Sequence, residues 1–331
     1  MNSYTSNSEE AKLERSMARR FLLRYALPFC VFFAMAALAW DWLLREQVIF
    51  RTETHGAAKL NRIMAKHPGE VAILGSSRAL GSYIPDSLFP SAYNYGINGI
   101  GYRVMDLFLE KELQSGNTAP ILVNFDYQMF VGSGGDPTNY LPFTSDPQIW
   151  QLMGDLGLQA PFYRIPGLRF YGGLDGYMRE FLNQRMQLTK WVTRGASIEK
   201  NVLPQDHFEK LVKQRLDEPS GWTPDSILIG RFRQRIQQGK DRQWYIVVAP
   251  YHWSYYQSFH PGQLVTAKAF LHELDQLPQV KVIEINGATW PDSLFANTTH
   301  INLAGALRFN RELRPLLSTD DSTPTPPAWP L

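Results

Sequence analysis

Short apolar runs alternate with longer amphipathic stretches along most of this chain. Five runs are apolar and nearly unbroken, as strands buried on both faces of a sheet should be: 71–74, 92–95, 121–125, 244–249 and 280–285. Between them apolar residues recur at helical spacing, for example in 103–114 and 264–276. Strands that alternate with helices form βαβ units, so we expect an α/β fold with a doubly wound parallel sheet.

The longest apolar run lies at the N-terminus. Residues 25–40 carry no charged side chain, and four arginines precede them: Arg15, Arg19, Arg20 and Arg24. This run spans about 24 Å as a helix, and aromatic and arginine anchors at its ends extend its reach toward a full bilayer. The positive-inside bias predicts a cytoplasmic head at 1–24, an inner-membrane helix at 25–44 and a periplasmic remainder. A cleavable signal peptide is the alternative, because the small residues at 37–39 resemble a cleavage site.

The rest of the chain divides into one domain and a tail. We expect a single domain over 46–317. Within it, 129–239 breaks the strand and helix rhythm with Gly-, Pro- and aromatic-rich segments and two amphipathic helices near 176–192 and 206–216. We interpret this stretch as an insertion or lid over the site. Residues 318–331 contain four prolines among small polar residues, and we expect them to be disordered.

Composition narrows the function classes. Lys and Arg number 33 against 31 Asp and Glu, a formal charge of +2, so no broad basic surface for nucleic acid is expected. The single cysteine, Cys30, lies in the N-terminal apolar run and cannot form a disulfide within one chain. The seven histidines show none of the spacings typical of a catalytic zinc site. We therefore expect neither a metal nor a cofactor.

The first apolar run of the domain ends in a turn with a candidate nucleophile. Ser77 closes a Gly-Ser-Ser turn that begins at Gly75, directly after 71–74. Open α/β sheets form their ligand crevices at the carboxyl ends of strands, and N–H groups after such a glycine can face an oxyanion. The base that a serine needs is available in His300, in an expected loop just before a C-terminal helix. We expect Ser77 and His300 to meet, whereas a purely structural protein would bury Ser77 away from His300.

Both motifs resemble those of the SGNH/GDSL hydrolase superfamily. Residues 75–77 match its Gly-Asp-Ser with serine in place of aspartate, and residues 297–300 match its Asp-x-x-His with asparagine in place of aspartate. The resemblance covers about 71–128 and 244–311, and it implies a three-layer, flavodoxin-like parallel sheet. The chain is more closely similar to the membrane-anchored branch that includes the D-alanine transfer protein of lipoteichoic acid and the alginate O-acetylation proteins.

The resemblance implies a set of catalytic roles. Ser77 would be the nucleophile, His300 the base, and the oxyanion donors would come from Ser77, Gly99 and Gln128. Asn297 occupies the position of the family's aspartate. Its neutral amide orients an imidazole but does not stabilise the charged ring, and the comparable change in serine proteases costs about four orders of magnitude in turnover.

Two arrangements would restore activity. The serine and histidine could work as a dyad, or another carboxylate, Asp292 or Asp126, could fold in behind the histidine. Arg78 is a candidate for binding an anionic group, with a surface ion pair as the alternative. His252 follows the fourth strand and is a candidate substrate contact, with a packed loop histidine as the alternative.

These residues predict a cell-envelope serine esterase or O-acyltransferase that acts on an acylated polysaccharide or glycan. The resemblance adds a membrane-bound O-acyltransferase as a partner. The alternative is a catalytically silent SGNH-like module that binds polymer or assembles a membrane acylation complex, which the neutral Asn297 favours.

Overall fold

Five parallel strands form the central sheet of the computed structural model, which describes residues 6–131, 135–187, 189–217 and 223–317. The strand order is β2-β1-β3-β6-β7, and every pairing in this sheet is parallel. The strands are β1 (Val71–Leu74), β2 (Ala92–Asn94), β3 (Ile121–Asn124), β6 (Trp244–Val248) and β7 (Val280–Glu284). The five predicted runs are confirmed, each ending within one residue of its expected end. The α/β prediction is therefore confirmed.

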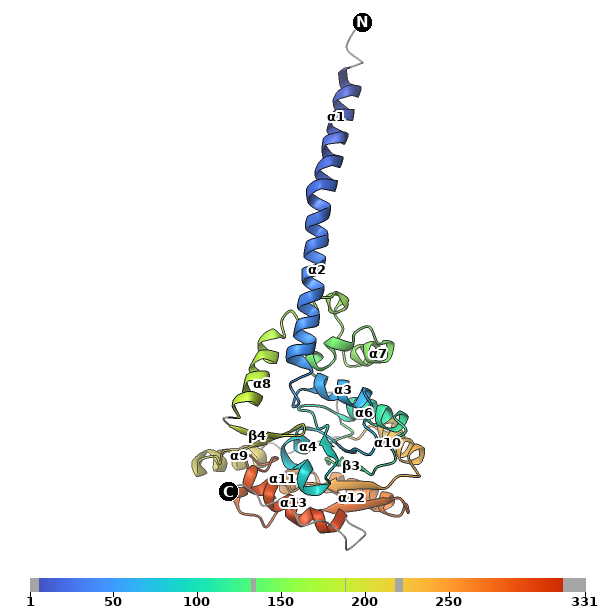
Figure 1. The fold of residues 1–331 in the computed structure, drawn as a ribbon. Coiled ribbons are helices and arrows are strands. Elements are labelled where there is room, and N and C mark those ends of the chain that lie inside the picture. The colour runs from blue at the N-terminus through green and yellow to red at the C-terminus, as the bar shows by residue number, and fades with distance from the viewer. Residues whose placement is uncertain (1–5, 132–134, 188, 218–222, 318–331) are drawn as a thin grey trace.

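Helices cover both faces of this sheet (Figure 1). Alternation along the strands explains this: Ala72 and Leu74 belong to one apolar cluster and Val71 and Ile73 to the other. The first cluster includes residues of α3 (Gly56–Met64), α6 (Tyr102–Gln114), α10 (Ser226–Gln238) and α12 (Pro261–Asp275). The second includes residues of α4 (Ser77–Ser82), α5 (Pro85–Leu88) and α13 (Leu303–Leu317). The order of the strands is the 2-1-3-4-5 order of doubly wound sheets.

A long N-terminal helix projects from this domain (Figure 1). It runs through α1 (Ser6–Phe21) and α2 (Leu27–Leu43), with π-helical turns at Leu22–Ala26 and Leu44–Ile49. The stretch Glu14–Ile49 is long and apolar enough to cross a membrane, a property that N-terminal signal sequences share. The helix expected at 25–44 lies within it, and its orientation in a membrane stays a prediction.

The expected insertion contains more regular structure than its sequence indicated. Its elements are three 3-10 turns (Pro137–Asn139, Leu141–Phe143 and Pro161–Arg164), the helices α7 (Pro147–Asp155), α8 (Leu174–Met186) and α9 (Gln205–Asp217), and the antiparallel pair β4 (Lys190–Thr193) and β5 (Ala196–Glu199). The helix expected at 176–192 was thus too long, because its last residues form β4. The end of the stretch was also misplaced, since α10 packs in the main core through Leu228, Phe232 and Ile236.

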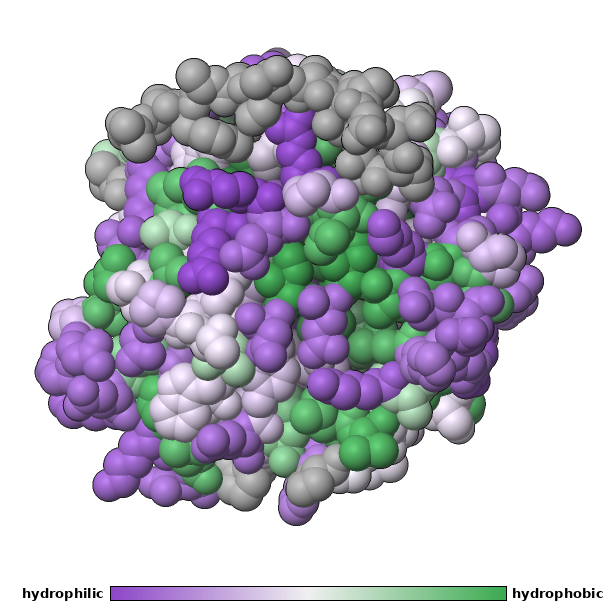
Figure 2. Space-filling model, turned by 90° about the horizontal axis from the view of Figure 1, so that it is seen from below, coloured by the Kyte–Doolittle hydropathy of each residue, from purple (hydrophilic) through white to green (hydrophobic). Residues whose placement is uncertain are grey.

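The end of the domain opposite the N-terminal helix has a mixed surface. Seen from that side, hydrophobic residues gather near the middle of the face and hydrophilic residues surround them (Figure 2).

The tail expected to be disordered, 318–331, and the first five residues of the expected cytoplasmic head lie outside the described residues.

Candidate active site

Ser77 is presented at the carboxyl edge of the sheet by the turn between β1 and α4. Gly75 has a φ of +152°, and a Cβ there would lie 2.7 Å from the Cβ of Ala79 and 2.9 Å from that of Asn124. Only a glycine therefore fits this turn. The hydroxyl of Ser76 caps α4 by accepting the N–H of Arg78 at 3.2 Å. This leaves Ser77 as the first residue of α4, with its side chain in a pocket.

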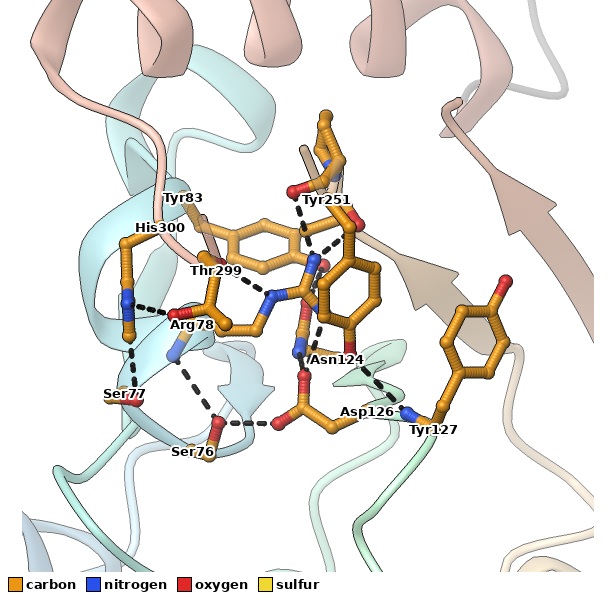
Figure 3. A network of polar contacts seen from close by, with 12 residues as sticks. Ser76, Ser77, Arg78, Tyr83, Asn124, Asp126, Tyr127, Tyr251, Thr299 and His300 are labelled. Carbon is orange, nitrogen blue, oxygen red and sulfur yellow. Dashed lines mark hydrogen bonds and ion pairs between the residues drawn. The ribbon is translucent and has the colours of Figure 1, made fainter. Parts of the chain in front are cut away.

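His300 reaches Ser77 from the loop before α13. The side-chain oxygen of Asn297 accepts the backbone N–H groups of Thr299 and His300, both at 2.9 Å, and these bonds close a tight turn. The turn holds the imidazole so that Nε2 lies 2.8 Å from the Ser77 hydroxyl oxygen (Figure 3). The expected meeting of Ser77 and His300 is confirmed, and the reading in which Ser77 is buried away from His300 is excluded.

No carboxylate supports the back of His300 in the described part of the chain. Its Nδ1 lies 2.8 Å from the Thr299 hydroxyl and 3.1 Å from the Asn297 side-chain oxygen. Both can accept an Nδ1–H, which leaves Nε2 free to accept the serine proton. The carboxylate rescue is wrong, because Asp126 binds Ser76 and Arg78 while Asp292 binds His252.

The pKa of His300 falls from 6.5 to about 4. Burial of the ring is the main cause, because it disfavours the charged form, and the nearby Arg78 and Lys190 add to it. The negative charge of Asp126 opposes the shift without reversing it. His300 is therefore neutral at pH 7 and able to accept a proton, although the imidazolium that follows is poorly stabilised.

Two residues of the same pocket have a backbone N–H group without a partner. Among the described residues, the N–H groups of Ser77 and Gly99 form no hydrogen bond, and both residues line the pocket of about 300 Å³ that contains His300. Gly99 has a φ of +66°, which favours glycine. Gln128 lines the same pocket. All three residues expected to donate to the oxyanion thus line the pocket that contains the Ser77 hydroxyl, and their role as donors stays a prediction.

Arg78 holds the site together. It is 5% exposed, and its guanidinium donates to Thr299 O at 3.1 Å, to Pro250 O at 3.0 Å, to Asp126 Oδ1 at 2.8 Å and to Ala249 O. These bonds tie the His300 loop to the ends of β3 and β6 (Figure 3). The ion pair that the sequence offered as the alternative is present, with Asp126 as its partner and in a buried place. Arg78 also lines the pocket of Ser77, so its role in substrate binding stays a prediction.

The Arg78 guanidinium is also stacked and surrounded by buried polar groups that sequence reasoning missed. Its carbon lies 3.2 Å from the centre of the Tyr251 ring. Asn124 donates to Asp126 at 2.8 Å and accepts the Tyr83 hydroxyl at 2.8 Å. The available signal for Asn124 was its position, because it ends β3 at the same sheet edge as Ser77.

His252 is a structural residue, and its predicted contact with substrate is wrong. It has no exposed surface, it caps α11 (Trp253–Ser258), and its Nε2 lies 3.0 Å from Asp292 Oδ1. Burial lowers its pKa, although Asp292 pulls in the opposite direction. It packs against Phe208 and Phe295 and does not line the pocket of Ser77.

A second polar pocket has a volume of about 370 Å³ and is lined in part by neighbours in sequence of residues that line the first. Asn98 lines it, whereas the next residue, Gly99, lines the serine pocket. Lys190 lines it and lies close enough to His300 to affect its pKa. His55 is a buried wall residue whose Nδ1 accepts a backbone N–H of α3 at 3.1 Å, so its proton lies on Nε2.

The expected insertion does not cover Ser77 with its described residues. Of the residues described between 129 and 239, only Met129 and Val131 line the serine pocket. Described elements of the insertion instead line the second pocket and contact the base of the N-terminal helix. The interpretation as a lid is therefore wrong for the described part of 129–239.

Comparisons with known proteins leave the family open. No protein-family model and no curated protein matches this sequence. Among solved structures, the chain is similar to one provisionally described as a platelet activating factor from Streptococcus pneumonia, with 13% identity, a TM-score of 0.37, and coverage of 86% of this chain and 99% of that chain. This likeness is too distant to bear on the fold or the activity.

Proposed function

We propose that this protein is a membrane-anchored serine esterase or O-acyltransferase of the SGNH type. The contact of 2.8 Å between the Ser77 hydroxyl and His300 Nε2, in a pocket with two unpartnered N–H groups, carries this proposal. A hydroxyl, a neutral imidazole and N–H donors are the groups that acyl transfer requires.

The reaction would proceed in two steps. His300 Nε2 takes the Ser77 proton while the serine oxygen attacks the acyl carbonyl carbon, and the Ser77 and Gly99 N–H groups bind the oxyanion. The tetrahedral intermediate then collapses: the carbonyl forms again, the bond to the leaving group breaks, and His300 passes its proton to that group. Water or a sugar hydroxyl then attacks the acyl-serine, gives its proton to His300 and releases the acyl group, and Ser77 recovers its proton.

The order of functional groups along the chain supports the SGNH assignment. Ser77 follows the first strand of the sheet, Gly99 follows the second, Gln128 follows the third, and His300 precedes the last helix. The departures are Ser76 and Asn297, each of which occupies the position of an aspartate in the family's motifs. We place the domain in the periplasm, because the arginines precede the apolar run.

The second pocket supports an acceptor rich in hydroxyl groups. It combines the carboxylates of Asp136 and Glu180 with the side chains of Arg179, Asn183 and Lys190. Such a mixture of donors and acceptors suits a sugar better than an apolar chain. An acylated envelope glycan would thus lie across both pockets, with a membrane-bound O-acyltransferase as the donor partner.

The competing proposal is a catalytically silent module of a membrane acylation complex. The neutral Asn297 behind His300 favours it, because the imidazolium has no carboxylate partner.

Labelling with a fluorophosphonate probe separates the two proposals. We expect the full chain in detergent to gain one phosphonate adduct by intact mass and the Ser77→Ala variant to gain none. Hydrolysis of p-nitrophenyl acetate should be lost in the same variant. A folded wild-type protein that stays unlabelled beside a labelled reference esterase would support the silent module.

A further inference from the structure

The base of the N-terminal helix is clamped by one segment of the insertion. Gly167 has a φ of +82°, and a Cβ there would lie 2.8 Å from the Cβ of Ala37. The Gly167 N–H donates to Asp41 Oδ1 at 3.2 Å. Arg169 donates to both carboxylate oxygens of Asp41, at 2.6 and 2.5 Å. This buried ion pair fixes the segment against α2.

The clamp sets the level of the segment along α2. Ala37 lies inside the apolar run 25–40, about 6 Å along the helix from Asp41. The loop at Gly167 is therefore beside the last turns of that run. If the run crosses the lipid, this loop lies at its outer boundary.

Large apolar side chains of this segment face outward. Phe162 is 39% exposed, Ile165 48%, Leu168 47% and Tyr171 81%. Trp40 and Trp42 of the helix are also exposed at this level, and tryptophans favour the membrane–water interface. An apolar patch that continues the surface of a membrane helix is typical of a segment in contact with lipid.

Arginines lie beside this patch. A pocket of about 330 Å³ is lined by Arg45, Arg164 and Arg169, and no carboxylate is among its described lining residues. Arg169 is neutralised by Asp41, and Arg45 contacts Glu46 at 3.0 Å. The Arg164 guanidinium lies over the Trp150 ring at 4.2 Å and forms no ion pair among the described residues. The pocket therefore has an excess of positive charge.

We propose that residues 161–174 form a lipid-binding element in which Phe162, Ile165 and Leu168 enter the membrane interface and the pocket at Arg164 binds a phospholipid phosphate. Arginine forks suit phosphate oxygens, and headgroup phosphates lie at this level of a bilayer. The element holds the domain at a fixed height over the membrane. The proposal rests on the membrane placement of α2 and is independent of the chemistry at Ser77.

Fluorescence quenching tests whether the apolar side chains of this element enter the membrane interface. In a Cys30→Ser background of the full chain, Leu168→Cys is labelled with an environment-sensitive dye and reconstituted into phosphatidylcholine and phosphatidylglycerol vesicles. Val265→Cys is the matched control, because Val265 is 67% exposed on α12, at the far end of the domain (Figure 1). Lipids with a nitroxide on the acyl chain should remove most of the fluorescence at 168 and leave that at 265. If the nitroxide lipids quench the dye to the same extent at positions 168 and 265, the proposal is wrong.

Native mass spectrometry tests whether the pocket at Arg164 binds a phospholipid phosphate. We expect the wild type to retain phosphatidylglycerol but not a diacylglycerol of the same chains, and Arg164→Gln to lower retention about tenfold, because it removes a charge-assisted contact. Arg231→Gln is the control, since Arg231 is an exposed arginine of α10. Equal retention by the two variants, or retention of diacylglycerol, would refute the phosphate site. A loss in fluorophosphonate labelling is expected in neither variant.

Discussion

The described residues of the domain include two serine–histidine pairs, and the pairs differ in a way that defines the site. Ser77 lies 2.8 Å from Nε2 of His300, and Ser254 lies 2.8 Å from Nδ1 of His252. Only the second pair has a carboxylate, because the remaining ring nitrogen of His252 contacts Asp292 at 3.0 Å. A hydrogen-bond chain from serine to histidine to aspartate is therefore present where no reaction is expected.

The pair of Ser77 and His300 differs from the second pair in two ways: it is open to a pocket, and it has unpartnered N–H groups beside it. Ser254 and His252 have no exposed surface, and their bonds serve to cap α11. Ser77 instead lines a pocket that it shares with the unpartnered Gly99 N–H. A substrate carbonyl can reach only this pair. The reactive pair is therefore identified by the pocket in front of its serine and not by a carboxylate behind its histidine.

Replacing each of the two histidines by alanine should reveal the largest difference between the two pairs. His300→Ala is expected to slow fluorophosphonate labelling by about a hundred- to ten-thousandfold, because it removes the base. His252→Ala should leave labelling unchanged and lower the free energy of unfolding by about 2–4 kcal/mol, since it removes a buried cap. Labelling kinetics by intact mass and urea unfolding measure the two effects. Equal loss of labelling in both variants, with both folded, would contradict the distinction.

A carboxylate behind His300, like the one that His252 has in Asp292, should make the first pair more reactive. In Asn297→Asp the carboxylate can keep the bonds to the N–H groups of Thr299 and His300, and its charge stabilises the imidazolium. We expect labelling to become about ten- to a thousandfold faster, less than the whole effect known for serine proteases. Asn302→Asp is the control, because Asn302 is a buried asparagine in the same loop that bonds to Ser293 O. An unchanged rate in a folded Asn297→Asp protein would show that charge behind the ring is not limiting.

The sequence predicted the sheet and the reactive pair for the same reason. Strands buried on both faces are unbroken apolar runs, and the loops that follow them meet at one edge, so Ser77 and His300 could be placed together. Short elements outside this rhythm were missed. Residues 190–193 look like the end of a helix, and only pairing with 196–199 makes them a strand.

The chemistry around the pair could not be predicted, because it depends on which partners folding brings together. For Arg78 the sequence left the binding of an anionic group and a surface ion pair open, yet the side chain is buried between the loops that follow three strands. For His252 the sequence left a substrate contact and a packed loop histidine open, and the aromatic rings of Phe208 and Phe295 pack against it as the second alternative predicts. Thr299 carried no signal beyond its place beside His300.

The pH dependence of labelling should also separate the site from an ordinary histidine. Burial, Arg78 and Lys190 lower the pKa of His300 from 6.5 to about 4. Because the neutral ring is the base, it stays competent as pH falls from 7, and we expect the rate to be halved near pH 4. Rates measured over this range, with folding followed by circular dichroism, test this. A midpoint near 6.5 would mean that the ring is solvated. In Asn297→Asp the midpoint should move up, because a negative charge favours the imidazolium.

The smallest expected effect concerns the oxyanion donor at Gly99. A Cβ at this position meets nothing within 4 Å, so Gly99→Ala costs only the strain of its φ of +66°, about 1 kcal/mol of stability. Gly116→Ala is a matched control, because Gly116 has a φ of +76°, equally open surroundings and no place in the pocket. Both variants should lose the same stability in urea unfolding. Only Gly99→Ala should also slow labelling, by less than about tenfold, since strain tilts an N–H that remains present. If both variants label at the wild-type rate, Gly99 does not bind the oxyanion, and Gln128 is the next donor to test.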